Sequence, residues 1–580
     1  MGNRGLCSSA DGPRTAPEPA HDCLFPMFVV KVSDFLQMDG VPEPHHVLRS
    51  RGLLHEWKPG MSAIFVSHQW LGRAHPDPFG KHAEALRQAL SGMIDGSVQV
   101  EQNLEDEILS DPLDGPQLLH SYIFLDWFAI PQITARAPGI NEETTKSDAS
   151  FAVQSIPFYV EVSDVFLALV PELTHTETGK YCNYLSWFSR GWCRAELWCH
   201  VLSNKHDKRV IVVHSAKDAK FMLSWDWQDN IIVDGDFTVE SDRAVVAGLG
   251  QKAIESRIQH LSSEGPADVV RFFLARRPAM LGQLPETRDT DDFLKHFQFP
   301  SLENALHDAS GVNALACAVL SGDISMVKLL GRKRADVNSR LHGLVDVGFG
   351  DGMTLLMAAC KTIQPPAMVS TLLQLRADVE AQIDTGETAA CYLNCPEHVK
   401  LFVEAKADLN TGHEPLCLTP LSSALCGMSS SDTLRAMLAA RCDPNPRSKG
   451  LGETPLLVVA RFARGRRHGL ELARVLLEHR ADPNVAARPH GAFAWTCYQN
   501  QLRSWVQGLE SCPPTAQNWA TMSGASPLAV AASSGDEAMT NLLLDAGAAP
   551  VPNDRGDLPE DLARAFGHVH LLPTLSTFAV

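Results

Sequence analysis

The second half of this chain repeats a short phrase, and this repetition limits the fold more than any other feature. The phrase is a basic residue, a small residue, aspartate, any residue, and then asparagine or glutamate. Its copies are Arg334–Asn338, Arg376–Glu380, Lys406–Asn410, Arg441–Asn445 and Arg480–Asn484, with aspartates 42, 30, 35 and 39 residues apart. Ala546–Pro550 is a degenerate sixth copy. A period of this length predicts stacked helical units, because one unit cannot bury its apolar face alone.

A second phrase, in phase with the first, predicts where each unit begins. It contains Thr or Ser before Leu or Ala, often with Pro between them, and its copies start at Met353, Glu387, Leu418, Glu453 and Ala525. The hydroxyl can satisfy backbone groups at a helix start, and Pro suits a first helical turn. Apolar helical runs separate the two phrases, and we expect Leu476 and Leu477 of one such run in the stacked core.

Together the two phrases resemble the ankyrin repeat over roughly residues 300–575. The resemblance implies an all-α solenoid whose concave face binds partner proteins. The histidine that follows leucine in the ankyrin phrase is missing from every copy. One interval, near 485–523, is too long and holds Trp495, Trp505 and Trp519, so we expect an insertion there.

The first 230 residues have a different core, since eight of the eleven tryptophans lie between Trp57 and Trp227. Apolar runs predict strands that alternate with helices, which favours an α/β domain with a parallel sheet covered on both faces. The expected strands are 63–66, 122–125, 165–170 and 209–213. The expected helices are 81–90, 150–162 with Pro157 in a first turn or at a kink, and 192–202 with Ser189 as a cap. Further helices are expected at 244–261 and 269–274, which close this domain or link it to the repeats.

Ligands of an open parallel sheet bind beyond the carboxyl ends of its strands. The segments that leave the expected strands combine a hydroxyl, an imidazole, a carboxylate, an amide and aromatic rings. The candidate ligand-binding residues there are Ser67, His68, Trp70, Asp126, Trp127 and Gln132. The alternative is that these residues are helix caps and packing aromatics.

Residues 189–197, Ser-Arg-Gly-Trp-Cys-Arg-Ala-Glu-Leu, resemble the Trp-Cys-x-x-Glu-Leu stretch of TIR domains. Residues 65–68 are similar to the first TIR strand, and 124–132 are similar to the related heterokaryon-incompatibility domains. The resemblance implies a TIR/flavodoxin-like fold. Since some TIR domains cleave NAD at the nicotinamide–ribose bond, it also implies Glu196 as the essential carboxylate, with Trp192 in the ligand site. Many TIR-like domains only self-associate, so both activities stay open.

Composition narrows the classes of function. Fifty Lys and Arg against 68 Asp and Glu give a net charge of −18, which repels nucleic acid. The 14 cysteines have no regular spacing, and no long apolar run predicts a membrane span. Cys193, Cys199 and His200 lack a fourth zinc ligand, so we expect no metal and no cofactor. We expect a cytoplasmic protein, peripheral to a membrane only if Gly2 and Cys7 are acylated.

The sequence therefore predicts four parts: a disordered tail (1–24), a TIR-like α/β domain (25–230), a helical extension or linker (231–299) and the ankyrin repeats (300–575). The leading hypothesis is an intracellular signalling scaffold that binds protein partners through its repeats, with the TIR-like domain for self-association or output. The alternative is an NAD glycohydrolase, in which NAD is the substrate and Glu196 the catalytic residue.

Overall fold

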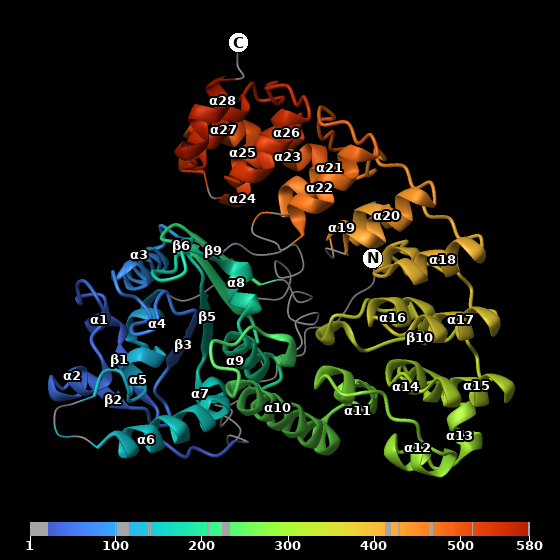
Figure 1. The fold of residues 1–580 in the computed structure, drawn as a ribbon, viewed down its shortest axis with the longest axis horizontal. Coiled ribbons are helices and arrows are strands. Elements are labelled where there is room, and N and C mark those ends of the chain that lie inside the picture. The colour runs from blue at the N-terminus through green and yellow to red at the C-terminus, as the bar shows by residue number, and fades with distance from the viewer. Residues whose placement is uncertain are drawn as a thin grey trace, which may run out of the picture.

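The computed structural model describes residues 21–98, 100, 115–136, 139, 141–205, 208–222, 232–411, 419–426, 430–462, 464, 468–512 and 514–577. An α/β domain is followed by an arc of helix pairs that curves around one side of it (Figure 1). The expected disordered tail lies almost wholly outside the described residues.

A seven-stranded sheet forms the centre of the α/β domain, in the order β2-β1-β4-β3-β5-β8-β9. Its strands are β1 (Phe28–Lys31), β2 (Leu54–Glu56), β3 (Ala63–His68), β4 (Tyr122–Phe124), β5 (Val165–Leu169), β8 (Val210–Ser215) and β9 (Asp218–Phe221). The four predicted strands, β4, β3, β5 and β8, are mutually parallel. The sheet as a whole is mixed, which corrects the expected all-parallel sheet: β1, β2 and β9 pair antiparallel at its two edges.

Strand β3 lies in the middle of the parallel part because it is apolar on both faces. All six of its residues are buried, as expected for a strand covered by helices on both sides. The ring of Phe65 stacks against Phe124 of β4 and Phe166 of β5, with centroids 4.9 and 5.5 Å apart. These contacts fix the strands that carry the candidate site.

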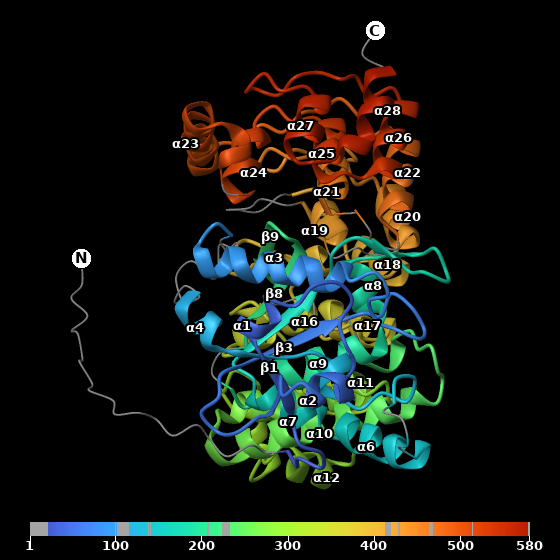
Figure 2. The same ribbon diagram turned by 90° about the vertical axis from the view of Figure 1, so that its left-hand side faces the viewer.

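Helices cover both faces of the sheet (Figures 1 and 2). They are α1 (Val32–Phe35), α2 (His45–Ser50), α3 (Lys81–Asp95), α4 (Gly115–His120), α5 (Asp126–Ala129), α6 (Glu142–Gln154), α7 (Ile156–Val162), α8 (Tyr184–Ser189) and α9 (Gly191–Val201). Helices α7 and α9 pack on each other and on β3, whereas α3 packs against β8. A small hairpin, β6 (Leu173–Thr174) and β7 (Tyr181–Cys182), follows β5.

Two helix predictions need correction. The single helix expected at 150–162 is two helices, because Pro157 starts a new one: it lies in the first turn of α7, after Ser155. Ser189 does not cap α9. It ends α8 and donates its hydroxyl to the carbonyl of Ser186, while the N-cap position of α9 is Arg190, whose side chain does not cap the helix.

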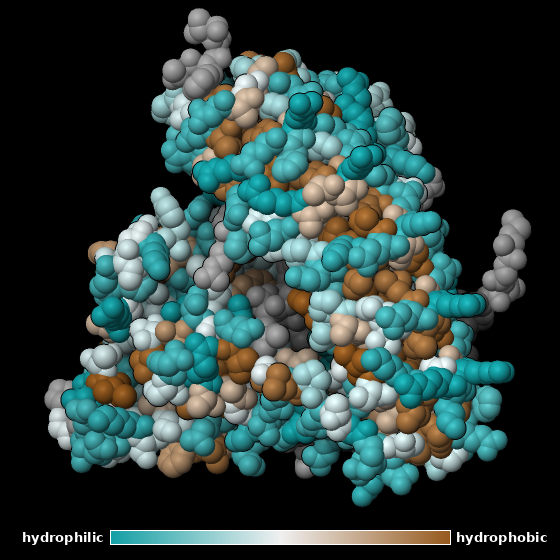
Figure 3. Space-filling view, turned by 45° about the vertical axis from the view of Figure 1, so that its right-hand side comes forward, coloured by the Kyte–Doolittle hydropathy of each residue, from teal (hydrophilic) through white to brown (hydrophobic). Residues whose placement is uncertain are grey.

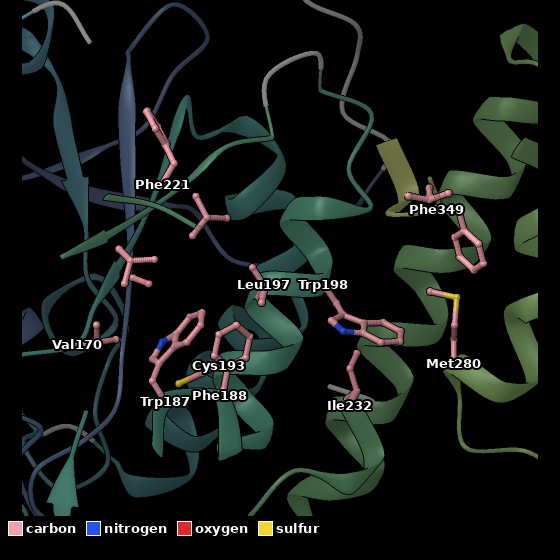
Figure 4. Packing of buried hydrophobic residues seen from close by; sticks show 14 of the residues in the cluster. Val170, Trp187, Phe188, Cys193, Leu197, Trp198, Phe221, Ile232, Met280 and Phe349 are labelled. Carbon is pink, nitrogen blue, oxygen red and sulfur yellow. The ribbon is translucent and has the colours of Figure 1, made fainter. Parts of the chain in front are cut away.

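Helices α10 (Asp242–Glu264) and α11 (Ala267–Met280) join the domain to the repeats. Helix α10 packs along α9, and α11 packs on the first repeat helix. Trp198 of α9 is directed toward the side where Met280 of α11 lies (Figure 4). Phe272 of α11 meets Phe349 of the repeats edge-on, at 5.3 Å. Most of the described buried apolar residues therefore form one cluster that continues from the sheet into the repeats.

Polar contacts reinforce this junction. The guanidinium of Arg271 in α11 donates to Asp308 at 2.8 Å and to Ser310 at 2.9 Å. The carboxylate of Asp268 accepts the backbone N–H groups of Gly311 and Val312. Two short helices, α12 (Thr290–His296) and α13 (Leu302–Leu306), lie between α11 and the first repeat.

The repeats are helix pairs stacked side by side. They are α14 (Ala314–Leu320) with α15 (Ile324–Arg332), α16 (Leu355–Lys361) with α17 (Pro366–Gln374), the 3-10 helix η4 (Ala389–Tyr392) with α18 (Pro396–Glu404), α19 (Pro420–Cys426) with α20 (Ser431–Ala439), α21 (Pro455–Phe462) with α22 (Gly469–Glu478), and α25 (Pro527–Ser534) with α26 (Glu537–Asp545). Helices α27 (Pro559–Ala565) and α28 (Leu572–Thr577) follow, with α27 on α25. Apolar residues form bands between hydrophilic rows on the outer side of the stack (Figure 3).

The two repeated phrases have the local roles that their chemistry suggests. The hydroxyls of Thr354, Thr419 and Thr454 accept backbone N–H groups three residues ahead, at the starts of first helices. In the other phrase each aspartate accepts the N–H two residues ahead, as Asp443 does from Asn445 at 2.9 Å. The leading basic residue has a positive φ, such as 66° at Arg441, the left-handed conformation that ends many helices.

The last residue of the phrase connects neighbouring repeats. The side-chain oxygens of Asn338, Asn410 and Asn445 each accept the N–H of the next phrase's aspartate, at 2.8 Å. Where the second copy has Glu380, its longer carboxylate accepts the N–H of Asp408 at 2.7 Å. We call this series the asparagine ladder.

The asparagine ladder omits the long interval near 485–523 and continues after it. The side chain of Asn484 accepts the N–H of Ala549, 65 residues later, at 2.7 Å, and α25 and α26 pack directly on α21 and α22. The intervening helices α23 (Gly491–Gln507) and α24 (Pro514–Met522) pack on each other and project beyond the stack (Figure 2). Backbone hydrogen bonds from Ala487 to Ala525 and from Gly524 to Ala487 close the base of this hairpin.

The phasing of α22 can be tested with two adjacent leucines. Leu476 is fully buried, so Leu476→Ala should lower the free energy of unfolding by about 2–5 kcal/mol. Leu477, which the sequence also placed in the core, is only partly buried, so we expect Leu477→Ala to cost less than about half as much. Denaturant unfolding measures both, and equal losses would contradict this packing.

Candidate functional site

The ends of two parallel strands bring the candidate residues together. Ser67 and His68 are the last two residues of β3. Asp126 begins α5, two residues after the end of β4, which lies beside β3. Since parallel strands end at the same edge of a sheet, these three side chains meet there.

Glu196 reaches this edge from α9, on the face of the helix that packs toward β3. The hydroxyl of Ser67 donates to Glu196 Oε2 at 2.5 Å. The same hydroxyl oxygen accepts the indole N–H of Trp187 at 3.0 Å. Ser67 is buried, whereas Glu196 keeps part of its surface accessible. The hydrogen bond from Ser67 therefore holds the carboxyl group in place.

A second polar group lies beside it. His68 Nε2 is 2.9 Å from Asp126 Oδ1, and Trp70 donates its indole N–H to Asp126 Oδ2 at 2.8 Å. The side chain of Asp126 is 30% exposed, whereas that of His68 is 2% exposed. His82 lies edge-on to His68, at 5.5 Å between ring centroids.

The surroundings shift the pKa values of Glu196 and Asp126 in opposite directions. Burial, with a smaller effect of the charge of Asp126, raises the pKa of Glu196 to about 8, against the opposing effects of the Ser67 hydrogen bond and of His68. Burial also opposes ionisation of Asp126, but the charge and hydrogen bond of His68 and the Trp70 N–H hold its pKa below the ordinary value. At neutral pH Glu196 is protonated, and Asp126 is ionised.

His68 completes the electrostatics of the site. Its burial favours the neutral ring, yet the carboxylate of Asp126 outweighs burial and raises the pKa of His68. The pKa of His82 is well below its ordinary value because of burial and the nearby His68. The site therefore combines the hydrogen-bonded His68–Asp126 pair with Glu196, a carboxyl group of raised pKa, and shifted pKa values of this kind are typical of acid–base chemistry.

Three of the predicted ligand residues have structural contacts instead. Trp127 is buried and donates its indole N–H to the carbonyl of Pro42. Gln132 donates its amide to the carbonyls of Asp126 and Ile130, which holds the turn after α5. Trp192 lies away from the site and donates to Asp242 of α10 at 3.1 Å. Trp70 is half-buried and meets Trp127 edge-on at 5.9 Å.

Sequence reasoning missed other residues of the site. Trp187 bonds to Ser67, the Ser186 hydroxyl donates to Gln69 at 2.6 Å, and Asp77 and His82 line a small pocket on the other side of His68. The aromatic run at 184–188, directly before the Trp-Cys stretch, was the signal that could have pointed to Trp187.

Comparisons with known proteins give matches among solved structures. No family model and no curated protein matches the sequence. Among solved structures, the human ASB11 ankyrin repeat domain is 19% identical with a TM-score of 0.31, covering 43% of this chain and 95% of that one. The ankyrin repeat domain of Bcl-3, of the IkappaB protein family, is 20% identical with a TM-score of 0.30, covering 44% and 97%. Both of these solved structures are ankyrin repeat domains.

The described residues contain neither a metal-binding cluster nor a membrane-spanning helix. Within them, no three His, Cys, Asp or Glu side chains gather in a way that could hold a metal ion. No helix in the same residues is both long and apolar enough to cross a membrane. Gly2 and Cys7, the expected acylation sites, lie outside the described part of the chain.

The pKa of Glu196 can be tested through stability. Between the ordinary glutamate value and about 8, the folded protein binds one proton more than the unfolded chain, so stability falls as pH rises through that window. Glu196→Gln removes this contribution. From about pH 5 to about pH 8.5, we expect the wild type to lose more than about 1 kcal/mol relative to Glu196→Gln.

Denaturant unfolding at the two pH values gives the comparison. The matched control is Glu143→Gln on α6, whose carboxylate is 78% exposed and whose stability should follow the wild type. Identical pH dependence in wild type and Glu196→Gln would contradict the raised pKa.

Proposed function

We propose that this protein is an interaction and signalling scaffold. Its ankyrin repeats (300–575) bind partner proteins, and residues 25–230 form a TIR-like domain for self-association or output. The observation that supports this best is the asparagine ladder, which connects successive repeats by side-chain hydrogen bonds. Repeats connected in this way hold an extended surface in a fixed shape, as proteins that bind partners through solenoids require.

The fold adds a condition to this proposal. The first helices of the pairs, such as α14, α16 and α19, lie on the side of the stack that faces the α/β domain (Figure 1). Arg464, between α21 and α22, forms an ion pair with Glu172, just after β5. This side is the concave face of the stack (Figure 1). A partner protein that binds there therefore competes for space with the α/β domain.

We expect Arg464→Glu to loosen this contact. The pair is exposed, so its loss should cost at most about 1 kcal/mol and raise amide hydrogen exchange around β6 and α21 by about two- to fivefold. The charge swap Arg464→Glu with Glu172→Arg should restore the wild-type exchange. Unchanged exchange in the single variant would show that the ion pair does not hold the two parts together.

The same variants test partner binding. Proteins that bind the concave face should be captured from cell extract in stoichiometric amounts, and more by Arg464→Glu than by wild type or the charge swap. Capture at background level by all three proteins would contradict the scaffold proposal.

A second function, cleavage of NAD, is favoured by one observation: two carboxyl groups at one strand edge have pKa values shifted in opposite directions. Such pairs are typical of glycosidic cleavage. In the TIR resemblance Glu196 is the essential carboxylate. A bound nicotinamide ring carries a positive charge, which would lower the pKa of Glu196 and favour the ionised form next to the ribose.

The proposed reaction is a hydrolysis. The bond between the ribose carbon and the nicotinamide nitrogen breaks, both electrons leave with neutral nicotinamide, and water adds to the ribose carbon with loss of one proton. The ionised Glu196 stabilises the positive charge on the ribose, and the Ser67 hydroxyl and Trp187 orient its carboxylate. The half-buried ring of Trp70 is available to stack on the substrate.

Wild-type protein incubated with NAD should release nicotinamide, measured by chromatography. Glu196→Gln should reduce the rate at least about 100-fold, and Glu143→Gln should not change it. Because the reaction needs ionised Glu196, kcat/KM should rise as pH increases toward about 8. A wild-type rate equal to that of Glu196→Gln would reject this function and leave the scaffold proposal untouched.

A further inference from the structure

Helix α23 exposes a row of large apolar side chains. They are Trp495 (59% exposed), Tyr498 (48%), Leu502 (42%), Trp505 (56%) and Val506 (86%). Residues three and four apart share one face of a helix, so these five form a continuous surface, which we call the aromatic stripe. Apolar patches of this kind on a folded protein mark interaction sites.

The opposite face of α23 is already packed. Cys497, Gln501 and Ser504 are buried there, where α23 meets α24. The guanidinium of Arg555, which precedes α27, donates to the hydroxyl of Ser504 at 3.3 Å. The helix is therefore held on the solenoid without help from the stripe, which lies on the projecting hairpin of Figure 2.

The spacing within the stripe fits another helix. Trp495, Tyr498, Leu502 and Trp505 follow one another at intervals of three, four and three residues, which is the a/d pattern of a coiled-coil contact. A lipid surface is disfavoured, because membrane-bound amphipathic helices carry several basic residues and α23 has a single charged one, Arg503. The chain's net charge of −18 also opposes approach to anionic lipid.

The order of the side chains points to a second copy of the same helix. Without Val506, the other four residues of the stripe begin and end with tryptophan in either direction, and their intervals read three, four, three. In an antiparallel pair, Trp495 would face Trp505 of the second copy, and Tyr498 would face Leu502 of the second copy. Such a contact is related by a two-fold axis and puts no charge opposite a like charge.

We propose that two copies of this protein associate through their aromatic stripes, with the two α23 helices antiparallel. The two α23–α24 hairpins then form a four-helix bundle. A buried aromatic side chain covers about 150–250 Å². With about half of each stripe residue exposed, one copy offers on the order of 500 Å², and two copies about 1,000 Å² in total. That area is at the lower limit of specific interfaces, so the dimer is reversible and forms at micromolar concentration.

Analytical ultracentrifugation of the full chain over a range of concentrations tests the proposal. The wild type should change from monomer to dimer, and Trp505→Lys should weaken the dissociation constant at least about tenfold. The control is Leu284→Lys, at an apolar residue that is 87% exposed and lies outside the stripe. This control should dimerise like the wild type, and circular dichroism checks that each variant is folded.

A charge pair tests the antiparallel register. Trp495→Asp and Trp505→Lys should each weaken the dimer, whereas both changes in one chain should restore at least part of the affinity. In the antiparallel pair each new carboxylate faces an ammonium group of the second copy, whereas a parallel pair would place like charges together.

Two results would overturn the proposal. One is a wild-type chain that stays monomeric at every concentration, including a monomer that binds phosphatidylcholine vesicles through the stripe. The other is a Trp505→Lys chain with the wild-type dissociation constant. A double variant that dimerises less than either single variant would refute the antiparallel register.

Discussion

The rest of the structure depends on one continuous apolar core, which runs from the sheet through α9, α10 and α11 into the first repeat. Trp198 and Met280 belong to it, and the contact of Phe272 with Phe349 extends it into the solenoid. Because the base of the solenoid shares its core with the α/β domain, the arc has a fixed direction. Its first helices therefore face that domain, and the Arg464–Glu172 ion pair can form.

The same core positions the candidate site. Helix α10 packs against α9, and Trp192 of α9 donates a hydrogen bond to Asp242 of α10. A Cβ at Gly191 would lie 2.0 Å from the ring of Phe237, so the ring would have to move to admit any larger residue there. With α9 held there, Glu196, one helical turn after Trp192, accepts the hydrogen bond of Ser67, and the site on the strand ends depends on packing outside it.

Much of the fold could be predicted from the sequence, because repeated residues and apolar runs are visible in the sequence itself. The repeated aspartates indicated the solenoid, and four apolar runs indicated the parallel strands. The antiparallel edge strands β1, β2 and β9 were missed because each has only three or four residues, too few for a clear apolar pattern. The structural roles of Trp127 and Gln132 could not be predicted from the sequence either. Both follow a strand as ligand residues do, but Trp127 donates to the carbonyl of Pro42, far away in the sequence, and Gln132 donates to carbonyls of its own turn.

The hairpin of α23 and α24 leaves and rejoins the stack at adjacent points, where Ala487 pairs with Gly524 and Ala525. The asparagine ladder passes beneath it from Asn484 to Ala549. Insertions or deletions in this hairpin therefore leave the register of the repeats unchanged. Relatives of this protein can gain, lose or replace the whole α23–α24 hairpin during evolution while the solenoid keeps its curvature. The hairpin can therefore diverge faster than the repeats that carry it.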